Sequence, residues 1–174
     1  MMIGKNDFAS ARDVTNKAIA IDVNLVVVNQ VCSLTKNRNF CTGILNSNPS
    51  PSLDVLGNII SNEIQISATR TLNVIRLNLL PKASTAQKGH LTYCQGRYES
   101  SLFDNGRIIP KYAANDYNGA KKMALIAENY GTQCENSFKS PPAGASPLTK
   151  ENHELSDLFD IFVAICTLLL HHHL

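Results

Sequence analysis

The sequence predicts an all-α protein: an up-down-up-down four-helix bundle with an N-terminal helical hairpin extension and two disulfides. Three observations support this fold class. Apolar residues recur at steps of three and four along several long runs, which is the spacing of one helix face. Segments rich in Pro, Gly, Ser and Asn separate these runs. Cys94 and Cys134 lie almost symmetrically about a polar break at Asn115-Asp116, as on the arms of an antiparallel helical hairpin.

The chain of 174 residues suits one domain, and its 44% hydrophobic content allows a sizeable core. We expect residues 1–22 to be a disordered leader or the remnant of a targeting segment. Charged residues interrupt this stretch, whereas a secretory signal needs an uninterrupted apolar core of about 7 to 15 residues. The folded domain is expected at 23–170, followed by a tail at 171–174.

The N-terminal hairpin is predicted over residues 23–48. A valine-rich run from Val23 leads to Cys32, and its composition permits either a helix or a strand. A polar turn then lies midway to Cys41, so the two cysteines are expected to meet. A break rich in Pro, Ser and Asn separates the hairpin from the bundle, which is expected at 52–170.

The first two bundle helices are predicted on either side of Pro81. Ser52 is a suitable N-cap for the first helix, whose apolar stripe continues until Pro81 stops it. The second helix is expected to start near residues 85–87. Its interior contains Asn105-Gly106 and Pro110. Because Pro lacks a backbone donor and clashes one turn back, we expect a kink or local irregularity at 105–110.

The last two bundle helices are predicted to begin near Asp116 and Thr149, on either side of a loop rich in Pro, Gly and Ser. The third helix carries a seam of small and apolar residues at alternating steps of three and four, as bundle helices do. The stripe of the fourth helix includes Cys166, which is therefore expected to be a buried thiol. Short connections make neighbouring helices antiparallel.

The five cysteines divide by position into two pairs and a remainder. The two hairpins predict the disulfides Cys32–Cys41 and Cys94–Cys134 and leave Cys166 as a free thiol. The sequence has no C-x-x-C motif and no Cys/His spacing typical of zinc. Structural disulfides imply an oxidising compartment.

Composition and motifs argue against several functions. A formal charge of +2 with scattered Lys and Arg does not suggest nucleic-acid binding, and no run reaches the roughly 18 apolar residues of a membrane span. His90 and His153 stand alone, so we expect no catalytic residue, no cofactor and no metal site. The histidine run at 171–173 is expected to be a tag remnant or a frayed tail. A cross-linked bundle without catalytic residues indicates a binding or inhibitory module, with a carrier of a small hydrophobic ligand as the alternative.

Several segments around the cysteines form a specific combination. They are Val31-Cys32-Ser33-Leu34-Thr35, Phe40-Cys41, Leu91-Thr92-Tyr93-Cys94 with Tyr98, Asn115-Asp116-Tyr117-Asn118-Gly119-Ala120, Cys134-Glu135-Asn136-Ser137-Phe138-Lys139 and Ser146-Pro147-Leu148-Thr149-Lys150-Glu151-Asn152. Together with a fifth cysteine, they resemble the plant invertase and pectin methylesterase inhibitors over about residues 23–170. The chain is most similar to the subgroup labelled "putative invertase inhibitors", which includes some pollen allergens.

The resemblance implies a secreted protein of the apoplast or cell wall that forms a stoichiometric complex with a carbohydrate-active enzyme and covers its active-site cleft. The partner would be a plant acid invertase or a pectin methylesterase, because inhibitors of both kinds share the scaffold. The resemblance also implies that the first cysteine pairs with the second, and the third with the fourth.

Two positions depart from the family's target-specific patterns. Well-understood invertase inhibitors carry Pro-Lys-Phe at the turn between the second and third bundle helices. Here the similar Pro110-Lys111-Tyr112 lies too early, and Tyr117-Asn118-Gly119 occupies the matching positions. Pectin methylesterase inhibitors tend to carry Thr directly before the fourth cysteine, where this sequence has Gln133.

We expect the partner enzyme to contact residues of the larger disulfide-linked hairpin that lie outside its predicted apolar stripe. These are Asn115, Tyr117, Asn118, Lys121 and Gln133.

Overall fold

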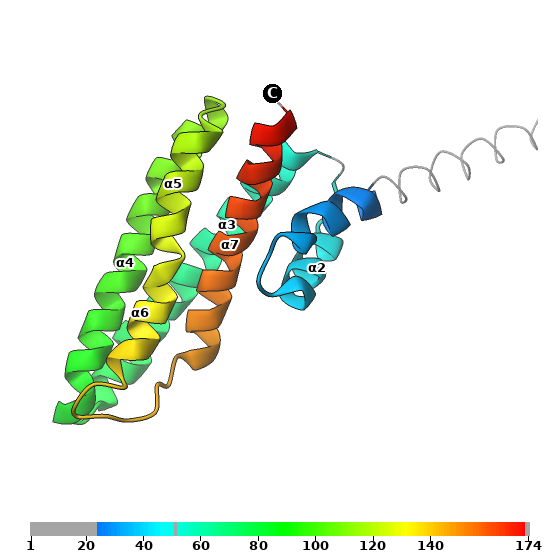
Figure 1. Ribbon diagram of the computed structural model, residues 1–174. Coiled ribbons are helices and arrows are strands. Elements are labelled where there is room, and N and C mark those ends of the chain that lie inside the picture. The colour runs from blue at the N-terminus through cyan, green and yellow to red at the C-terminus, as the bar shows by residue number, and fades with distance from the viewer. Residues whose placement is uncertain (1–23, 51, 173–174) are drawn as a thin grey trace, which may run out of the picture.

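The computed structural model in Figure 1 describes residues 24–50 and 52–172. Its elements are a helix at residues 24–33, α2 (Arg38–Ser47), α3 (Leu53–Asn73), the π-helix η1 (Val74–Leu79), the 3-10 helix η2 (Leu80–Lys82), α4 (Thr85–Ala113), α5 (Tyr117–Ala127), α6 (Asn129–Ser137) and α7 (Thr149–His172). The described residues form no strand. The predicted leader at 1–22 lies outside them.

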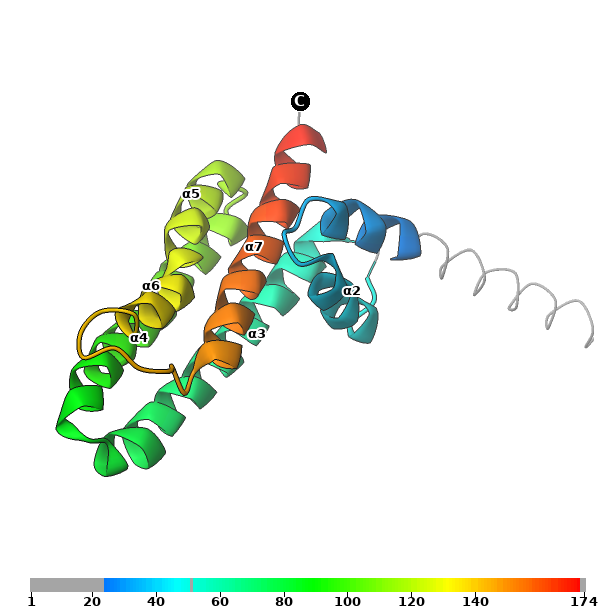
Figure 2. The same ribbon diagram turned by 60° about the horizontal axis from the view of Figure 1, so that its bottom comes forward.

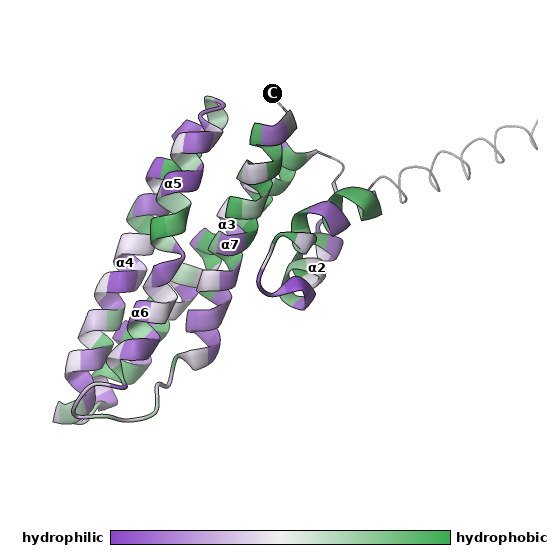
Figure 3. Ribbon diagram, viewed as in Figure 1, coloured by the Kyte–Doolittle hydropathy of each residue, from purple (hydrophilic) through white to green (hydrophobic). Residues whose placement is uncertain are grey.

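Four rods form the bundle: α3 with η1, α4, α5 with α6, and α7. They alternate in direction along the chain, so the predicted up-down-up-down bundle is confirmed (Figure 1). Figure 2 shows the same arrangement from a second angle, with the N-terminal hairpin beside α3 and α7 and away from α4. The core between the rods contains fully buried aromatic side chains from three of them: Tyr98, Phe138, Phe159 and Phe162. In Figure 3, hydrophobic colour is frequent along α7, whereas α4 is largely hydrophilic or neutral.

The first bundle helix begins where the sequence predicts and ends in a wider turn. The Ser52 hydroxyl accepts a hydrogen bond from the Val55 N–H at 3.4 Å, which confirms Ser52 as the N-cap. After Asn73 the helix continues as the π-helix η1, whose hydrogen bonds span one more residue than those of an α-helix. Pro81 lies in the 3-10 turn that follows, where the rod ends.

The predicted irregularity at 105–110 is wrong, because α4 is helical without interruption. Asn105 is buried, and a partner on α3 satisfies its side chain: its amide donates to the Ser61 carbonyl oxygen and its Oδ1 accepts from the Ser61 hydroxyl, both at 3.0 Å. Pro110 lies in the last turn of the helix and is exposed. The missing N–H therefore affects the end of the helix, while the buried Tyr112 anchors that turn in the core.

The predicted third helix consists of two helices, α5 and α6, which are separated at Glu128. The Glu128 carbonyl oxygen accepts a hydrogen bond from the Ser156 hydroxyl of α7 at 2.8 Å. One turn further, α6 approaches α7 so closely that a Cβ on Gly131 would lie 2.1 Å from the Asn152 carbonyl oxygen. The break thus lies within one turn of a close contact between these two rods.

The fourth bundle helix, α7, begins at Thr149 as predicted and extends to His172. Part of the predicted tail at 171–174 is therefore helical, and His173 and Leu174 lie outside the described residues. Cys166 is free and fully buried on this helix. Burial raises the pKa of its thiol to about 12.

The N-terminal hairpin is helical on both arms, at residues 24–33 and in α2. The Cys32–Cys41 disulfide joins the arms, with Cα atoms 5.5 Å apart. The valine-rich first arm is thus a helix rather than a strand, and it buries Val28 and Val31.

The turn of this hairpin docks on α7 through polar contacts. The Lys36 backbone N–H donates to Asp160 Oδ2 and the Asn37 side-chain amide donates to Asp157 Oδ2, each at 2.7 Å. The Lys36 ammonium also pairs with Glu128. The hairpin is therefore joined to the bundle by polar contacts at its tip and by buried side chains, such as Val28 and Leu45, that belong to the same core.

Candidate protein-interaction surface

The hairpin formed by α4, α5 and α6 is the candidate interaction surface. The Cys94–Cys134 disulfide joins α4 to α6 near one end of the bundle, with Cα atoms 4.7 Å apart. The two disulfides of the fold are therefore those that the sequence predicts. At the other end of the bundle, a short turn connects α4 to α5 (Figure 1).

This α4–α5 turn has a defined geometry. Asn115 has a φ of 59°, in the left-handed region that Asn tolerates better than most residues. Asp116 is the N-cap of α5: its Oδ1 accepts the Gly119 N–H at 2.8 Å, and the Lys111 ammonium lies 3.0 Å from its Oδ2. The Gly119 N–H and the Lys111 ammonium lower the pKa of the Asp116 carboxyl. The turn is therefore fixed by local hydrogen bonds.

The prediction that Tyr117 lies outside the apolar stripe is wrong, because it is only 4% exposed. It precedes the buried Ala120 by three positions and so begins the same helix face. Its ring meets that of Tyr112 edge-on, with centroids 5.3 Å apart. Its hydroxyl donates to Asp54 Oδ1 at 2.8 Å and lies 2.7 Å from Asn115 Oδ1. Burial and the Asp54 carboxylate raise the pKa of Tyr117 to about 12.

Three other predicted contact residues lie at the accessible end of the hairpin. Asn115 and Asn118 are exposed, and Lys121 is half-buried. Further along α5, Ile126 is 61% exposed. On α4, Phe103 is exposed beneath the Arg107 guanidinium, whose central carbon lies 5.4 Å from the ring centroid. The surface therefore offers amides and cations beside apolar side chains.

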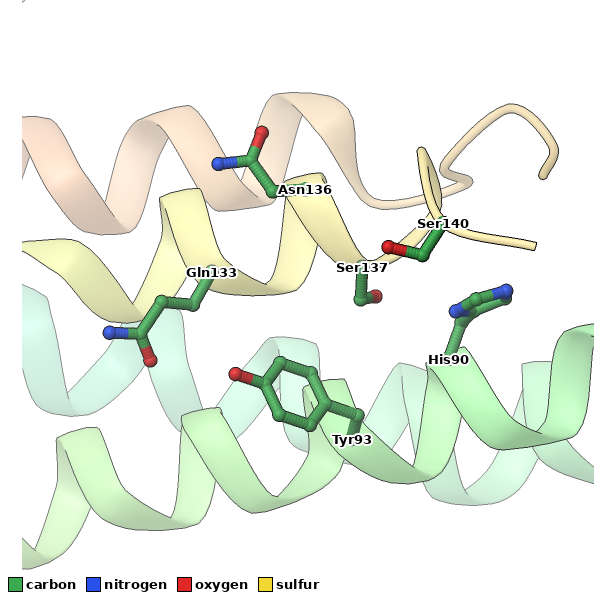
Figure 4. A pocket seen from close by; sticks show the side chains of 6 residues that line it. All are labelled: His90, Tyr93, Gln133, Asn136, Ser137 and Ser140. Carbon is green, nitrogen blue, oxygen red and sulfur yellow. The ribbon is translucent and has the colours of Figure 1, made fainter. Parts of the chain in front are cut away.

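The structure does not bring Gln133 together with the other predicted residues. It lies on α6, about three helical turns beyond Lys121. There it lines a groove between α4 and α6 with a volume of about 490 Å³. The side chains that line the groove, shown in Figure 4, are His90, Tyr93, Gln133, Asn136, Ser137 and Ser140.

Arg97 forms contacts at the Gln133 end of this groove. Its Nη1 donates to Gln133 Oε1 at 3.1 Å. Its guanidinium carbon lies 5.2 Å from the Tyr93 ring centroid and 5.4 Å from that of Tyr130, within the range of a cation–π interaction. Its Nε–H is buried and has no hydrogen-bond acceptor among the described residues.

The sequence analysis missed this groove because it treated His90 as isolated. The register of the residues is the signal that could have revealed it. Four of the six lining residues directly precede a buried residue, so they lie along the adjoining edges of α4 and α6. The pairs are His90/Leu91, Tyr93/Cys94, Gln133/Cys134 and Ser137/Phe138.

Residues 24–50 and 52–172 contain no group of three or more His, Cys, Asp or Glu side chains that could hold a metal ion. They also contain no helix that is long and apolar enough to cross a membrane. His90 packs at 5.0 Å from the Phe138 ring, and its Nε2 lies 3.1 Å from the Pro142 carbonyl oxygen. It thus contacts the loop between α6 and α7.

The fold is that of a disulfide-linked four-helix bundle. The family described as "Plant invertase/pectin methylesterase inhibitor" matches residues 26–165 of the chain. The chain therefore belongs to this family, and the resemblance seen in its cysteine motifs is confirmed. Members of the family are named as inhibitors, not as enzymes.

Individual relatives carry names of both kinds. A "Pectinesterase inhibitor" from Actinidia deliciosa is 28% identical over 146 residues, which cover 82% of this chain and 79% of the relative. A "Putative invertase inhibitor" from Platanus orientalis is 31% identical over 136 residues, which cover 76% of this chain and 80% of the relative. The crystal structure of a mutant form of a pectin methylesterase inhibitor from Arabidopsis shares the fold, with a TM-score of 0.74 at 21% identity over 80% of this chain and 95% of that one.

Proposed function

We propose that this protein inhibits a plant cell-wall carbohydrate-active enzyme, an acid invertase or a pectin methylesterase, by forming a stoichiometric complex that blocks the active-site cleft. Family membership and the names of the relatives support an inhibitor with one of these targets. The protein acts outside the cell, in the apoplast or cell wall. Its two disulfides support this location, because structural disulfides persist in oxidising compartments.

The docking surface is the end of the hairpin around the α4–α5 turn, and Gln133 extends it along α6. The observation that carries this proposal is the attachment of the turn to the start of α3. Tyr117 bonds to Asp54, and the Tyr112 hydroxyl donates to the Leu53 carbonyl oxygen at 2.9 Å. A turn that is already ordered loses little conformational entropy when a partner binds.

The individual contacts follow from the exposed side chains of the turn and of α5. The Asn115 and Asn118 amides supply hydrogen bonds, and the Lys121 ammonium supplies attraction to carboxylates in the target cleft. Ile126 adds exposed apolar area further along α5. Tyr117 is a positioning residue, since it holds the turn in place from the buried side.

Inhibition assays test the proposal directly. Purified acid invertase and purified pectin methylesterase are each titrated with this protein at acid and at neutral pH. Inhibition of one enzyme with a one-to-one endpoint is expected. Full activity of both enzymes at micromolar protein would contradict the proposal.

A pair of charge reversals tests the docking surface. Lys121→Glu is expected to weaken inhibition about tenfold or more, which corresponds to about 1.4 kcal/mol of binding free energy. Lys82→Glu makes the same charge change on an exposed side chain at the opposite end of the bundle and is expected to leave inhibition unchanged. Equal losses in both variants would place the docking surface elsewhere.

The alternative is a carrier of a small hydrophobic ligand. Displacement of a bound fluorescent dye by a fatty acid tests it. Displacement combined with no inhibition of either enzyme would favour the carrier.

A further inference from the structure

The groove between α4 and α6 has the composition of a small-molecule site. Its lining contains an imidazole, a phenol, two carboxamides and two hydroxyls, and no carboxylate. Its volume of about 490 Å³ lies within the range of about 300 to 1,000 Å³ that is typical of ligand pockets. Figure 4 shows Tyr93 and Gln133 toward one end of the groove and His90 near Ser140 at the other. The groove lies at the disulfide end of the hairpin, away from the proposed docking turn, and Gln133 is the residue that it shares with the proposed docking surface.

Two cations border the groove through residues that line it. Arg97 donates to Gln133, and the Lys139 ammonium donates to Asn136 Oδ1 at 2.7 Å. In the part of the chain that the structure describes, neither cation forms an ion pair with a carboxylate. Arg97 is partly buried between two rings, where a cation without an anionic partner is less stable than in water.

The carboxylates of α4 and α6 have other partners, and Glu99 pairs with the Arg76 guanidinium. Glu135 turns toward α7: its Oε2 accepts from the Asn152 amide and its Oε1 from the Thr149 hydroxyl, both at 2.8 Å. Asp104 accepts the Tyr130 hydroxyl at 2.7 Å. The charge next to the groove is therefore positive and available to an anionic ligand.

We propose that this groove binds a sugar that carries a carboxylate, a uronic-acid oligosaccharide. Arg97 and Lys139, which border the groove through Gln133 and Asn136, supply the positive charge that attracts the carboxylate. The carboxamides and hydroxyls of the lining both donate and accept hydrogen bonds, as the hydroxyls of a sugar do. The Tyr93 ring is 44% exposed and offers an apolar face to the C–H side of a pyranose.

This binding goes beyond enzyme inhibition and is measured on the protein alone. Isothermal titration calorimetry is carried out with trigalacturonate and with its methyl ester, which has the same ring structure without the charges. The acid form is expected to bind at least about tenfold more tightly than the ester, since charge-assisted hydrogen bonds are about twice as strong as neutral ones. Absence of binding, or equal affinity for the two sugars, would overturn the proposal.

Three charge-neutralising variants locate the site. Arg97→Gln and Lys139→Gln are each expected to weaken trigalacturonate binding about tenfold. In an NMR titration with trigalacturonate, the chemical-shift changes of the groove residues are expected to disappear in both variants. Lys139 is exposed, and among the described residues its ammonium has one hydrogen bond, to Asn136, so this variant keeps the test independent of folding. Lys122→Gln removes an exposed charge from α5 and is the matched control. An equal loss in the control would show non-specific attraction and overturn the site.

Discussion

The two disulfide-linked hairpins of this protein are held to the rest of the molecule in different ways. The N-terminal hairpin docks its tip on α7 through Lys36 and Asn37. The α4–α6 hairpin shares a continuous core with α3 and α7, in which Tyr98 and Phe138 are fully buried. The first hairpin also places buried side chains in this core, among them Val31 and Leu45. The difference is that the second hairpin supplies two of the four rods, whereas the first lies beside the bundle and adds polar contacts at its tip.

The largest expected difference between the hairpins comes from removing each disulfide. The Cys94–Cys134 bridge spans 40 positions and the Cys32–Cys41 bridge spans 9. In the chain-entropy model, replacing both cysteines of the longer bridge by Ala costs about 4 kcal/mol of the free energy of unfolding, against about 3 kcal/mol for the shorter one. Urea unfolding of both double variants measures this. A larger loss for the shorter bridge would contradict the comparison.

A pair of glycines tests how tightly the second hairpin is packed. Gly131→Ala places a Cβ 2.1 Å from the Asn152 carbonyl oxygen, and overpacking of this kind costs about 1–3 kcal/mol. Gly96→Ala on α4 has nothing within 4 Å of its new Cβ and is expected to stabilise the helix by about 0.5–1 kcal/mol. Urea unfolding checks both signs. Equal stabilities would mean that α6 can move away from α7 without cost.

The attachment of the first hairpin is tested at Asn37. Asn37→Ala removes the N-cap of α2 and the hydrogen bond to Asp157, which should cost about 1 kcal/mol locally. Hydrogen exchange is expected to accelerate at residues 24–33 and in α2 but not in the bundle. Asn58→Ala on the exposed face of α3 is the control and should change neither region. Faster exchange throughout the bundle would show that the two parts open together.

The smallest expected effect concerns the carboxylates at the tip contact. Burial and the neighbouring Asp160 raise the pKa of Asp157, although the hydrogen bond from Asn37 opposes this. The folded state then binds the proton more tightly than the unfolded state, so stability falls as the pH rises through the folded pKa. Asp157→Asn removes this pH-dependent loss. The free energy of unfolding of the variant, relative to that of the wild type, should therefore increase from acid to neutral pH.

Asp116 provides the opposite case within the second hairpin. Its pKa is lowered by the Gly119 N–H and Lys111, so its contribution is present above the usual pKa of 3.8 and is lost as the pH falls through the folded value. The free energy of unfolding of Asp116→Asn, relative to that of the wild type, should therefore decrease from acid to neutral pH. Thermal melts of both variants as a function of pH measure the two slopes. Slopes of the same sign would contradict this assignment.

Features of the fold that depend on local pattern could be predicted from the sequence. Apolar spacing predicts the rods, Ser52 marks the start of α3, and the position of the cysteines predicts both disulfides. The failures depend on contacts between distant segments. Asn105 is compatible with a regular helix because Ser61 on another rod satisfies it, and the break at Glu128 involves a hydroxyl from α7.

The interaction surface was harder to predict for the same reason. Asn118 is exposed as expected, since a residue next to a helix start on the outer face remains in solvent. Tyr117 is adjacent in sequence but is buried, because Asp54 and Tyr112 supply partners for its hydroxyl and ring. The cation–π contacts of Arg97 join two helices, and spacing along one helix does not reveal them.

Burial of Cys166 has a consequence for how the disulfides persist. A spare thiol can attack an existing bridge and exchange partners with it, but only as an accessible thiolate. In the unfolded chain, a thiol with a pKa of about 8.5 is partly ionised near neutral pH. In the folded protein, burial raises the pKa of Cys166 to about 12 and closes off its sulfur. Scrambling of the two bridges by this thiol therefore requires the core around α7 to open first.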